Sequence, residues 1–484
     1  MQLGDLIRGA RLAPEHAAIE ITGLTADSRR VEPGFLFAAL PGSQVDGFRF
    51  VPAAIEAGAA AILAPAGAER SWDDGPVLVP VADARRELAL AAARFYPKQP
   101  ETIVAVTGTA GKTSVAVFAR QIFEHAGHRS ASIGTIGIVT SDGKNYGGLT
   151  TPDPVTLHRD LDRLAGDGIS HAALEASSHG LDQRRLDGVR LSAAGFTNLG
   201  RDHLDYHPDV ESYLQAKLRL FRVLLPDGRA AVIDADEAVA ARVAEEVGAR
   251  GNPLISFGRA GADLKLLDAG REGFSQILDL DWRGSRVKVR LPLAGAFQAR
   301  NAMMAACLAI AAGIEWRQAF AALDTLQGVP GRLELVARTK EGALVFVDYA
   351  HKPEALENVL TVLKPYATGR LVTVVGAGGD RDPGKRPIMG EIAGRLSDMV
   401  IVTDDNPRGE DPASIRAAIL AACSGAREIG DRSRAIREAV GLLGPGDVLC
   451  IAGKGHETGQ IVGGVVHPFS DHEEIAKAVG EDAA

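Results

Sequence analysis

Runs of apolar residues alternate with alanine-rich helical patterns along the whole chain, and Gly or Pro stands at most of the joints. This order predicts an α/β fold with largely parallel sheets. The expected strands include residues 102–106, 172–175, 193–197, 371–375, 399–403 and 448–451. The expected helices include residues 84–96, 301–312 and 316–326.

Two breaks in this pattern divide the chain. Pro97 and Pro100 interrupt it just after the first of these helices, and a stretch rich in Gly and Pro interrupts it again at residues 328–332. A chain of 484 residues is too long for a single hydrophobic core. We therefore expect three domains, at residues 1–98, 99–331 and 332–484.

Composition narrows the class of protein. The formal net charge of -9 argues against binding nucleic acid through bulk electrostatics. The three cysteines lie far apart in apolar surroundings, as buried thiols of a reducing compartment do. The first residues include an early acid and no long apolar run, so we expect neither a signal peptide nor a membrane span, and a cytoplasmic protein.

A glycine-rich segment, GTAGKTS at residues 108–114, stands between the strand at 102–106 and a helical pattern. Glycines let backbone N–H groups approach phosphate oxygens, Lys112 can neutralise phosphate charge, and the Thr113 hydroxyl can ligate Mg²⁺ near the helix dipole. The segment therefore predicts a binding loop for a nucleoside triphosphate. The alternative is a glycine-rich turn before a helix, with a surface lysine.

Two polar segments follow later strands of the same predicted sheet. Glu175 ends an apolar strand, so its carboxylate would lie at the sheet edge beside the phosphate loop and could ligate Mg²⁺ or cap the next turn. His203 and His207 follow the strand at 193–197, close to several acids. They indicate another metal or phosphate site, although histidines in a loop are more often structural.

Three polar clusters end the strands of the last predicted domain, at residues 376–382, 404–408 and 452–457. In a parallel sheet these clusters converge on one edge. Arginines there could grip carboxylates while an acid takes an ammonium, so the clusters indicate a site for a zwitterion. Glycine turns with capping charges are the alternative.

Four motifs resemble those of the Mur ligases, the ATP-dependent amide-forming enzymes of peptidoglycan precursor synthesis. In chain order they are GTAGKT at 108–113, EASSHG at 175–180, NLGRDHLDYH at 198–207 and DYAH at 348–351. The resemblance covers essentially the whole chain. It implies a domain for a UDP-linked substrate at the N-terminus, a central P-loop ATPase-type sheet for ATP and a Rossmann-like C-terminal domain for an amino acid.

The resemblance also assigns residues to ATP and metal. The expected catalytic residues are Lys112, Glu175, His203 and Lys217. The expected ATP contacts are Gly108, Thr109, Ala110, Gly111, Lys112, Thr113, Ser114, Asn301, Arg332 and Asp348, with His351 nearby. The expected Mg²⁺ ligands are Thr113, Glu175, His203 and Lys217. Lys217 matches a lysine that these enzymes carbamylate, which would let it hold a second Mg²⁺ with His203; its residue type alone would make it a solvated helix position.

Residues 405–408 resemble the motif of Mur ligases that add meso-diaminopimelate and not L-lysine, and an arginine there can select the extra carboxylate. The expected contacts to this amino acid are Arg381, Asp405, Asn406, Pro407, Arg408, Gly453 and Glu457. The expected contacts to the other substrate, UDP-MurNAc-L-Ala-D-Glu, are Ala26, Ser28, Ser43, Gln44, Val45, Thr150, Thr151, Ser177, Gln183 and Arg185.

The function implied by the resemblance is that of a monomeric, ADP-forming ligase of cell wall synthesis, needed for cell shape and division, with no nucleic-acid partner. ATP would phosphorylate the D-glutamyl γ-carboxylate, and an amine of diaminopimelate would attack the acyl phosphate. The chain departs from the family pattern at Ala110, Leu149, Gly200 and Gln298, which we expect to alter affinity and not the catalytic assignment.

Three other classes share part of the pattern. A folylpolyglutamate synthetase would share the ATP core but lack the N-terminal domain and the cluster at residues 405–408. A P-loop switch or motor would hydrolyse ATP or GTP without an amino acid. A non-catalytic module would bind a nucleotide without turnover.

Overall fold

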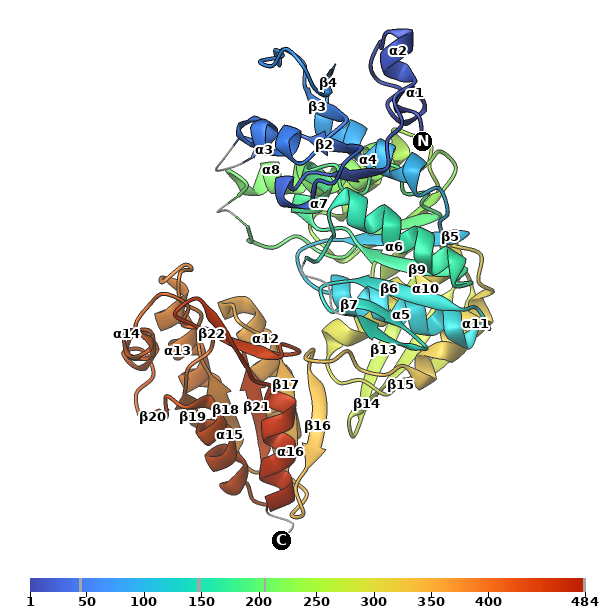
Figure 1. Ribbon diagram of the computed structural model, residues 1–484. Helices are drawn as coiled ribbons and strands as arrows, with labels where there is room; N and C mark the ends of the chain where they lie inside the picture. Colours follow the sequence, from blue (N-terminus) through green and yellow to red (C-terminus); the bar gives the residue numbers. More distant parts are fainter. Residues whose placement is uncertain (43–45, 146–148, 204–205, 482–484) are drawn as a thin grey trace. The chain divides into compact units, whose positions relative to one another are not determined.

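The computed structural model describes residues 1–42, 46–145, 149–203 and 206–481 (Figure 1). Its chain forms two compact units. The first comprises Met1–Leu267, Asp279–Val287 and Arg300–Leu323, and the second comprises Asp268–Leu278, Lys288–Ala299 and Asp324–Ala484. In the part of the chain that is described, no helix has the length and apolar character needed to cross a membrane.

The first unit begins with a small sheet whose strands are all parallel, in the order β1 (Gly23–Thr25), β2 (Phe35–Ala38), β3 (Ala61–Pro65) and β4 (Val77–Val81). The helices of this part of the chain are α1 (Leu3–Leu6), α2 (Pro14–Ala17), α3 (Val51–Glu56) and α4 (Ala84–Phe95). The Asp83 side chain caps α4 by accepting a hydrogen bond from the Arg86 N–H. Leu88 of α4 packs with Leu36 and Leu63 of the sheet in one buried core.

A second sheet has the strand order β15-β14-β13-β12-β11-β10-β5-β9-β6-β7-β8. Its strands are β5 (Thr102–Thr107), β6 (Ser130–Gly134), β7 (Gly137–Thr140), β8 (Gly143–Asn145), β9 (His171–Glu175), β10 (Ala193–Phe196), β11 (Ala230–Asp234), β12 (Leu254–Gly258), β13 (Leu264–Glu272), β14 (Ser275–Trp282) and β15 (Ser285–Leu291). The strands from β12 to β6 pair in parallel. β9 and β10 are buried along their whole length, which matches their continuous apolar sequence.

The helices that follow these strands are α5 (Lys112–His125), α6 (Pro154–Gly166), α7 (Ser178–Asp182), α8 (Val210–Arg219), α9 (Ala240–Gly248), α10 (Ala296–Ala311) and α11 (Trp316–Ala322). α10 begins five residues before the helix expected at 301–312, directly after Gly295, whose φ of 92° stops a helix from extending further back. The helix expected at 316–326 is divided into α11 and a 3₁₀ turn at Leu323–Thr325.

The second unit is built on a sheet with the order β16 (Glu334–Arg338), β17 (Leu344–Asp348), β21 (Val448–Ala452), β18 (Leu371–Val375), β19 (Met399–Val402) and β20 (Arg427–Glu428). Only the β16–β17 pair is antiparallel among these pairs. Its other elements are α12 (Pro353–Leu363), α13 (Lys385–Leu396), α14 (Pro412–Leu420), α15 (Arg432–Gly441), β22 (Gly459–Val462), β23 (Val465–Pro468) and α16 (Asp471–Glu481).

Both faces of this sheet are covered. Phe346 of β17 belongs to a core cluster with Leu360 of α12, while its neighbour Val347 belongs to another cluster with Ile436 of α15. Successive residues of one strand thus enter opposite cores, as in a doubly wound sheet. The α/β prediction is confirmed. Each of the four sheets, including the two-stranded β22–β23 sheet, falls within one of the three expected domains. The compact units group the chain differently, so those domain limits stay a prediction.

His158 offers a test of this packing. It is buried on α6, where its Nε2–H donates to the Asp187 carbonyl at 2.9 Å, and burial lowers its pKa to about 4. The His158 imidazole takes up a proton near pH 6.5 in the unfolded chain but only near pH 4 in the folded chain. The neutral, buried ring therefore contributes stability above pH 6.5, and this contribution is lost as the pH falls from 6.5 toward 4. Between pH 7 and pH 5 the wild type should lose about 2 kcal/mol more unfolding free energy than His158→Gln. Denaturant titration at both pH values measures this difference, and equal losses would contradict it.

Candidate functional site

The phosphate loop joins β5 to α5 through two glycines with positive φ, 140° at Gly108 and 84° at Gly111. A Cβ at Gly108 would overlap the Thr197 hydroxyl, and one at Gly111 would overlap the side-chain oxygen of Asn301. Backbone conformation and space therefore both require glycine at these two positions. Asn301, expected near the nucleotide, thus lies against the loop.

The segment that follows β10 holds the loop from one side. The Thr109 N–H donates to the Asn198 carbonyl at 2.9 Å, and the Ala110 N–H donates to Asn198 Oδ1 at 2.8 Å. The Thr197 hydroxyl donates to the Ala110 carbonyl at 2.7 Å. Both backbone groups of Ala110 are used in this way, so the loop keeps its shape without a polar side chain at this position.

Two lysines meet at the first carbonyl of the loop. Lys112 Nζ donates to the Gly108 and Thr109 carbonyls at 2.9 Å each, and Lys217 Nζ donates to the Gly108 carbonyl at 2.7 Å. Lys217 is only 1% exposed, and its ammonium lies 4.1 Å from the centre of the Tyr213 ring. The prediction from residue type alone, that Lys217 is a solvated helix position, is wrong. The two cations favour an anion at the loop.

Glu175 ends β9 as expected, and it is buried. Its Oε1 accepts a hydrogen bond from the Thr135 N–H at 2.8 Å, and its Oε2 accepts one from the Thr135 hydroxyl at 3.2 Å. That hydroxyl also lies 3.1 Å from the hydroxyl of Thr150. The carboxylate therefore holds the turn between β6 and β7, a contact that sequence spacing does not reveal.

Histidine and tyrosine rings cluster near the phosphate loop. The ring of His179 lies 4.8 Å from that of His203, 4.1 Å from that of Tyr206 and 5.7 Å from that of His207, measured between centroids. His203 has a φ of 54°, and its N–H donates to Asp202 Oδ1 at 2.8 Å. The structure thus gathers the two histidines expected from sequence and adds His179 and Tyr206.

The donor set near the loop fits Mg²⁺ bound together with phosphate. Thr113 supplies a buried hydroxyl in the first turn of α5, and Glu175 supplies a carboxylate. Within the described residues, no group of three or more His, Cys, Asp or Glu side chains could hold a metal ion by itself. Mg²⁺ commonly takes one or two protein oxygens and completes its shell with phosphate and water, so these donors suit it.

The residues expected to contact the sugar-peptide substrate form one network beside Glu175. Thr151 Oγ1 donates to the Glu175 carbonyl at 2.8 Å and lies 3.0 Å from Ser177 Oγ. Arg185 donates to the Thr151 carbonyl at 2.7 Å and to Gln183 Oε1 at 2.7 Å. These side chains are therefore fixed in place as a group before any ligand binds.

The contacts expected in the N-terminal part are less defined. Ala26 is exposed after β1 and Ser28 is half-buried, while Ser43, Gln44 and Val45 lie outside the described residues. This part is joined to the substrate network by an ion pair between Arg184 Nε and Asp83 Oδ2, at 3.2 Å.

In the second unit, Asp348 and Arg332 lie close to one another. Burial raises the pKa of Asp348 to about 6, and the Arg332 charge opposes that rise. Asp348 Oδ2 accepts from the Leu333 N–H at 2.6 Å, and the Arg332 guanidinium lies 4.6 Å from the centre of the Tyr349 ring. The His351 Nδ1–H donates to the Tyr349 carbonyl at 2.8 Å, and burial lowers the pKa of His351 to about 4, so its ring is neutral at pH 7.

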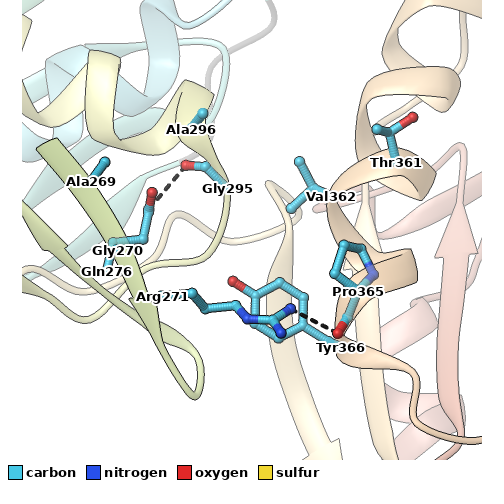
Figure 2. A pocket seen from close by; sticks show the side chains of 10 residues that line it. All are labelled: Ala269, Gly270, Arg271, Gln276, Gly295, Ala296, Thr361, Val362, Pro365 and Tyr366. Atoms are coloured by element: carbon cyan, nitrogen blue, oxygen red, sulfur yellow. Dashed lines mark hydrogen bonds between the residues drawn. The ribbon is translucent and has the colours of Figure 1, made fainter.

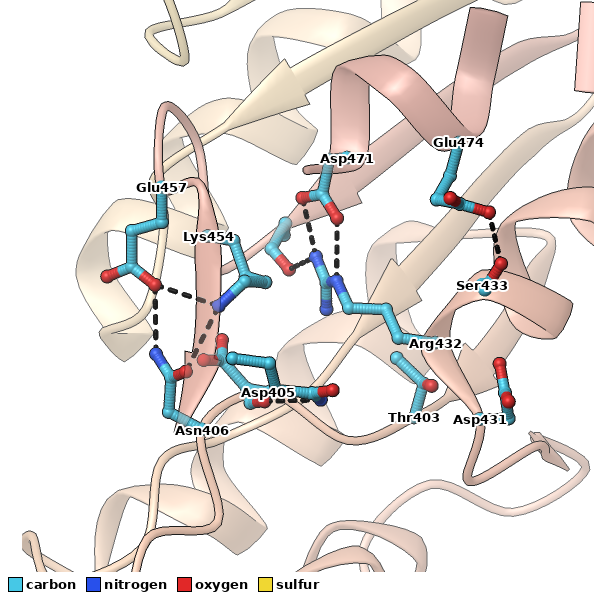
Figure 3. A network of polar contacts seen from close by, with 12 residues as sticks. Thr403, Asp405, Asn406, Asp431, Arg432, Ser433, Lys454, Glu457, Asp471 and Glu474 are labelled. Carbon is cyan, nitrogen blue, oxygen red and sulfur yellow. Dashed lines mark hydrogen bonds and ion pairs between the residues drawn. The ribbon is translucent and has the colours of Figure 1, made fainter. Parts of the chain in front are cut away.

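The loops after β19 and β21 bring most of the expected amino-acid contacts together (Figure 3). Asn406 Nδ2 donates to Glu457 Oε2 at 2.9 Å. A Cβ at Gly453 would overlap Asp405 Oδ2, so glycine is required where these loops approach. The Arg408 guanidinium donates to the Gly379 carbonyl at 2.8 Å. The expected contact Arg381 is exposed on the loop after β18, and Pro407 is buried.

Two buried cations that the sequence analysis gave no role support this cluster. Lys454 is fully buried and contacts Asn406 and Glu457. Arg432 donates to both carboxylate oxygens of Asp471, at 2.7 and 2.8 Å, and to the Ala452 carbonyl at 3.1 Å. Lys454 lies inside a motif that the sequence made visible, whereas the pairing of α15 with α16 through Arg432 had no signal in the sequence.

A cavity of about 220 Å³ also lies in the second unit, between the β13–β14 turn and α12 (Figure 2). Arg271 spans part of it, with its guanidinium 5.0 Å from the centre of the Tyr366 ring and donating to the Pro365 carbonyl at 2.7 Å. Gln276 donates to the Leu293 and Gly295 carbonyls at 2.8 and 3.0 Å. None of the residues expected at a functional site lines this cavity.

The fold and the loop define an α/β nucleotide-binding protein with a phosphate loop. Three family models match the chain: "Mur ligase family, catalytic domain" at residues 20–96, "Mur ligase middle domain" at 106–309 and "Mur ligase, glutamate ligase domain" at 331–455. The chain belongs to the Mur ligase family.

Individual relatives match over the whole length. The chain is 58% identical over 492 residues to a UDP-N-acetylmuramoyl-L-alanyl-D-glutamate--2,6-diaminopimelate ligase of Bradyrhizobium diazoefficiens, with 100% of both chains covered. It is 54% identical over 470 residues to a protein of the same name from Caulobacter vibrioides, with 96% of each covered.

Solved structures agree. A structure named for the same diaminopimelate ligase superposes with a TM-score of 0.74 at 33% identity, covering 100% of this chain and 99% of that one. A Mycobacterium tuberculosis folylpolyglutamate synthase complexed with ADP and AMPPCP superposes with a TM-score of 0.62 at 21% identity, covering 76% of this chain and 92% of that one. The second likeness concerns the fold alone.

Two glycines flanking α5 test the phosphate loop. Gly111→Ala should weaken ATP binding at least tenfold, because its methyl group would overlap Asn301 in a backbone with a φ of 84°. Gly127, after the other end of α5, has a φ of 89°, and no atom lies within 4 Å of the place that a methyl group would take, so Gly127→Ala incurs the backbone strain alone. Isothermal titration with Mg-ATP should show near-normal affinity for Gly127→Ala. Equal affinities in the two variants would contradict the assignment of Gly111 to the loop's binding shape.

Proposed function

We propose that this chain is an ATP-dependent, ADP-forming ligase that adds meso-diaminopimelate to UDP-N-acetylmuramoyl-L-alanyl-D-glutamate in peptidoglycan precursor synthesis. The observation that carries the proposal is the full-length identity to diaminopimelate ligases. A phosphate loop in one unit and a cluster of Asp405, Asn406, Arg408 and Glu457 in the other support it, since the reaction needs both an activating nucleotide and a zwitterionic acceptor.

The first step activates a poor electrophile. An oxygen of the D-glutamyl γ-carboxylate attacks the γ-phosphorus of ATP, and the bond from that phosphorus to the oxygen bridging the β- and γ-phosphates breaks. ADP departs as the leaving group, and the product is an acyl phosphate. Lys112 places positive charge at the loop, which offsets the repulsion between the carboxylate and the triphosphate. Bound Mg²⁺ would be held by Thr113 and Glu175 and would supply further charge stabilisation.

The second step forms the amide. A neutral amine of diaminopimelate attacks the acyl carbon, the new C–N bond forms, the bond to phosphate breaks, and the nitrogen loses a proton. The Arg408 side chain could take a carboxylate of the acceptor and the Glu457 carboxylate its ammonium. Lysine lacks that second carboxylate, so the same arginine would favour diaminopimelate.

The remaining assignments belong to the same proposal. Thr150, Thr151, Ser177, Gln183 and Arg185 would hold the sugar-peptide substrate beside Glu175. Carbamylated Lys217 would act with His203 at a second Mg²⁺. The enzyme would work as a cytoplasmic monomer with domains at residues 1–98, 99–331 and 332–484.

A single assay separates this function from its competitors. ADP and phosphate release are measured with UDP-MurNAc-L-Ala-D-Glu and ATP, with diaminopimelate, L-lysine or no acceptor. Release should depend on both the UDP substrate and diaminopimelate, and lysine should be a poor replacement. Release that needs neither substrate would identify a hydrolase, and faster turnover with lysine would overturn the acceptor assignment.

Lys217→Arg tests carbamylation. A guanidinium forms no carbamate and therefore cannot supply the anionic Mg²⁺ ligand that the proposal assigns to Lys217, so kcat should fall at least a hundredfold. Wild-type turnover should decline when dissolved CO₂ is removed and recover with bicarbonate, whereas the variant should not respond. Mg-ATP titration and thermal melting check that the variant remains folded. A variant with wild-type kcat would rule out an essential carbamate.

A further inference from the structure

Lys454 is a fully buried lysine in the loop after β21, and its ammonium is shared between two side chains. Nζ donates to Asn406 Oδ1 at 3.1 Å and to Glu457 Oε2 at 2.9 Å (Figure 3). A buried ammonium is costly unless it is paired and hydrogen-bonded. The position of this cation is therefore defined by these two partners.

The amide of Asn406 has one orientation in this network. Its Oδ1 accepts from Lys454 and also from the Ile461 N–H, at 2.9 Å, while its Nδ2 donates to Glu457 Oε2. A flipped amide would direct its NH₂ group at two donors. Lys454 and the backbone of β22 thus determine that the NH₂ group of the Asn406 amide, and not its oxygen, contacts Glu457.

The carboxylate of Glu457 is held on one oxygen. Both Lys454 and Asn406 donate to Oε2, so Oε1 takes part in neither contact. Figure 3 shows the Oε2 side turned toward the two donors and the other oxygen turned away from them. The side chain is 30% exposed, so the carboxylate is accessible to a ligand while its orientation is fixed.

The same contacts join three segments of the chain. β22 meets the loop after β19, since the Arg408 N–H donates to the Ile461 carbonyl at 2.9 Å and Gln460 Nε2 donates to the Asp405 carbonyl at 2.7 Å. Lys454 adds the loop after β21 to this pair. The ammonium is thus a shared point of attachment for the residues that the proposed function assigns to the acceptor.

We propose that Lys454 is a positioning residue for the acceptor amino acid, which fixes Glu457 and Asn406 so that Glu457 presents one oxygen to an ammonium of the acceptor. Lys454 touches no substrate in this role. The inference rests on the proposed function, because it takes the loops at residues 405–408 and 453–457 as the acceptor site.

Lys454→Met tests the inference, since it keeps the length and burial of the side chain and removes the ammonium. Glu457 can be hydrated in its place, and Asn406 keeps its bond to Ile461, so the fold should persist. Loss of the charge-assisted contact should raise KM for diaminopimelate roughly tenfold to a hundredfold. KM for ATP and for the UDP substrate should stay within about twofold of the wild-type values.

Two further variants separate positioning from general destabilisation. Arg370→Met removes a cation that pairs with Asp447 at 2.6 Å, next to the amino ends of β18 and β21, the opposite edge of the same sheet. It should lower the melting temperature without changing KM for diaminopimelate. Lys454→Gln, a neutral donor, replaces the Met variant if the latter does not fold.

A double-mutant cycle supplies the decisive comparison. If Lys454 acts through Glu457, the pair Lys454→Met and Glu457→Gln should raise KM for diaminopimelate no further than Glu457→Gln alone, within about twofold. An unchanged KM in Lys454→Met, an equal rise in Arg370→Met, or multiplicative effects in the cycle would each overturn the inference. A wild-type enzyme that does not turn over diaminopimelate would overturn the proposed function itself.

Discussion

Parallel pairing of β5 with β9 and β10 determines where the chemistry of the first unit can occur. Val106 lies opposite Glu175 and Thr107 opposite Phe196, so three strands end at the same level. The phosphate loop, the Glu175 carboxylate and the segment at Thr197 then leave the sheet side by side. Without this register, the hydrogen bonds between the loop and Asn198 could not form, and neither could the meeting of Lys112 and Lys217 at one carbonyl.

The same constraint places the proposed acceptor site of the second unit. Asp348 of β17 lies opposite Ala452 of β21, and Val374 of β18 lies opposite Ile451. The loops that follow these strands and β19 therefore share one edge, where backbone geometry brings Gly453 against Asp405. Charges then fill the edge in pairs, Lys454 with Glu457 and Arg432 with Asp471, because an unpaired charge would be costly at that depth.

The strands and both loop clusters were predictable because continuous apolar runs ending in Gly and polar residues have few alternatives in an α/β chain. The burial of the cationic side chains could not be predicted in this way. Lys217 is one polar residue in an amphipathic helix, and its hydrogen bond to the Gly108 carbonyl joins segments that are far apart in the sequence. Thr135 contacts Glu175 although the two residues are 40 positions apart in the sequence, and no local sequence pattern predicts such a contact.

The distribution of charge also differs between the two clusters. At the phosphate loop, the Lys112 ammonium contacts two backbone carbonyls, and its charge suits anions that would otherwise repel each other. The amino-acid cluster is closer to neutral, since Glu457 is shared with Lys454 and Asp471 with Arg432, and it can take a zwitterion without a large change in charge. Because the two clusters belong to different compact units, each can be preformed by its own sheet. Activation of the carboxylate and selection of the acceptor are then separate requirements. Only an amino acid that fits the acceptor cluster can react with the acyl phosphate formed by activation.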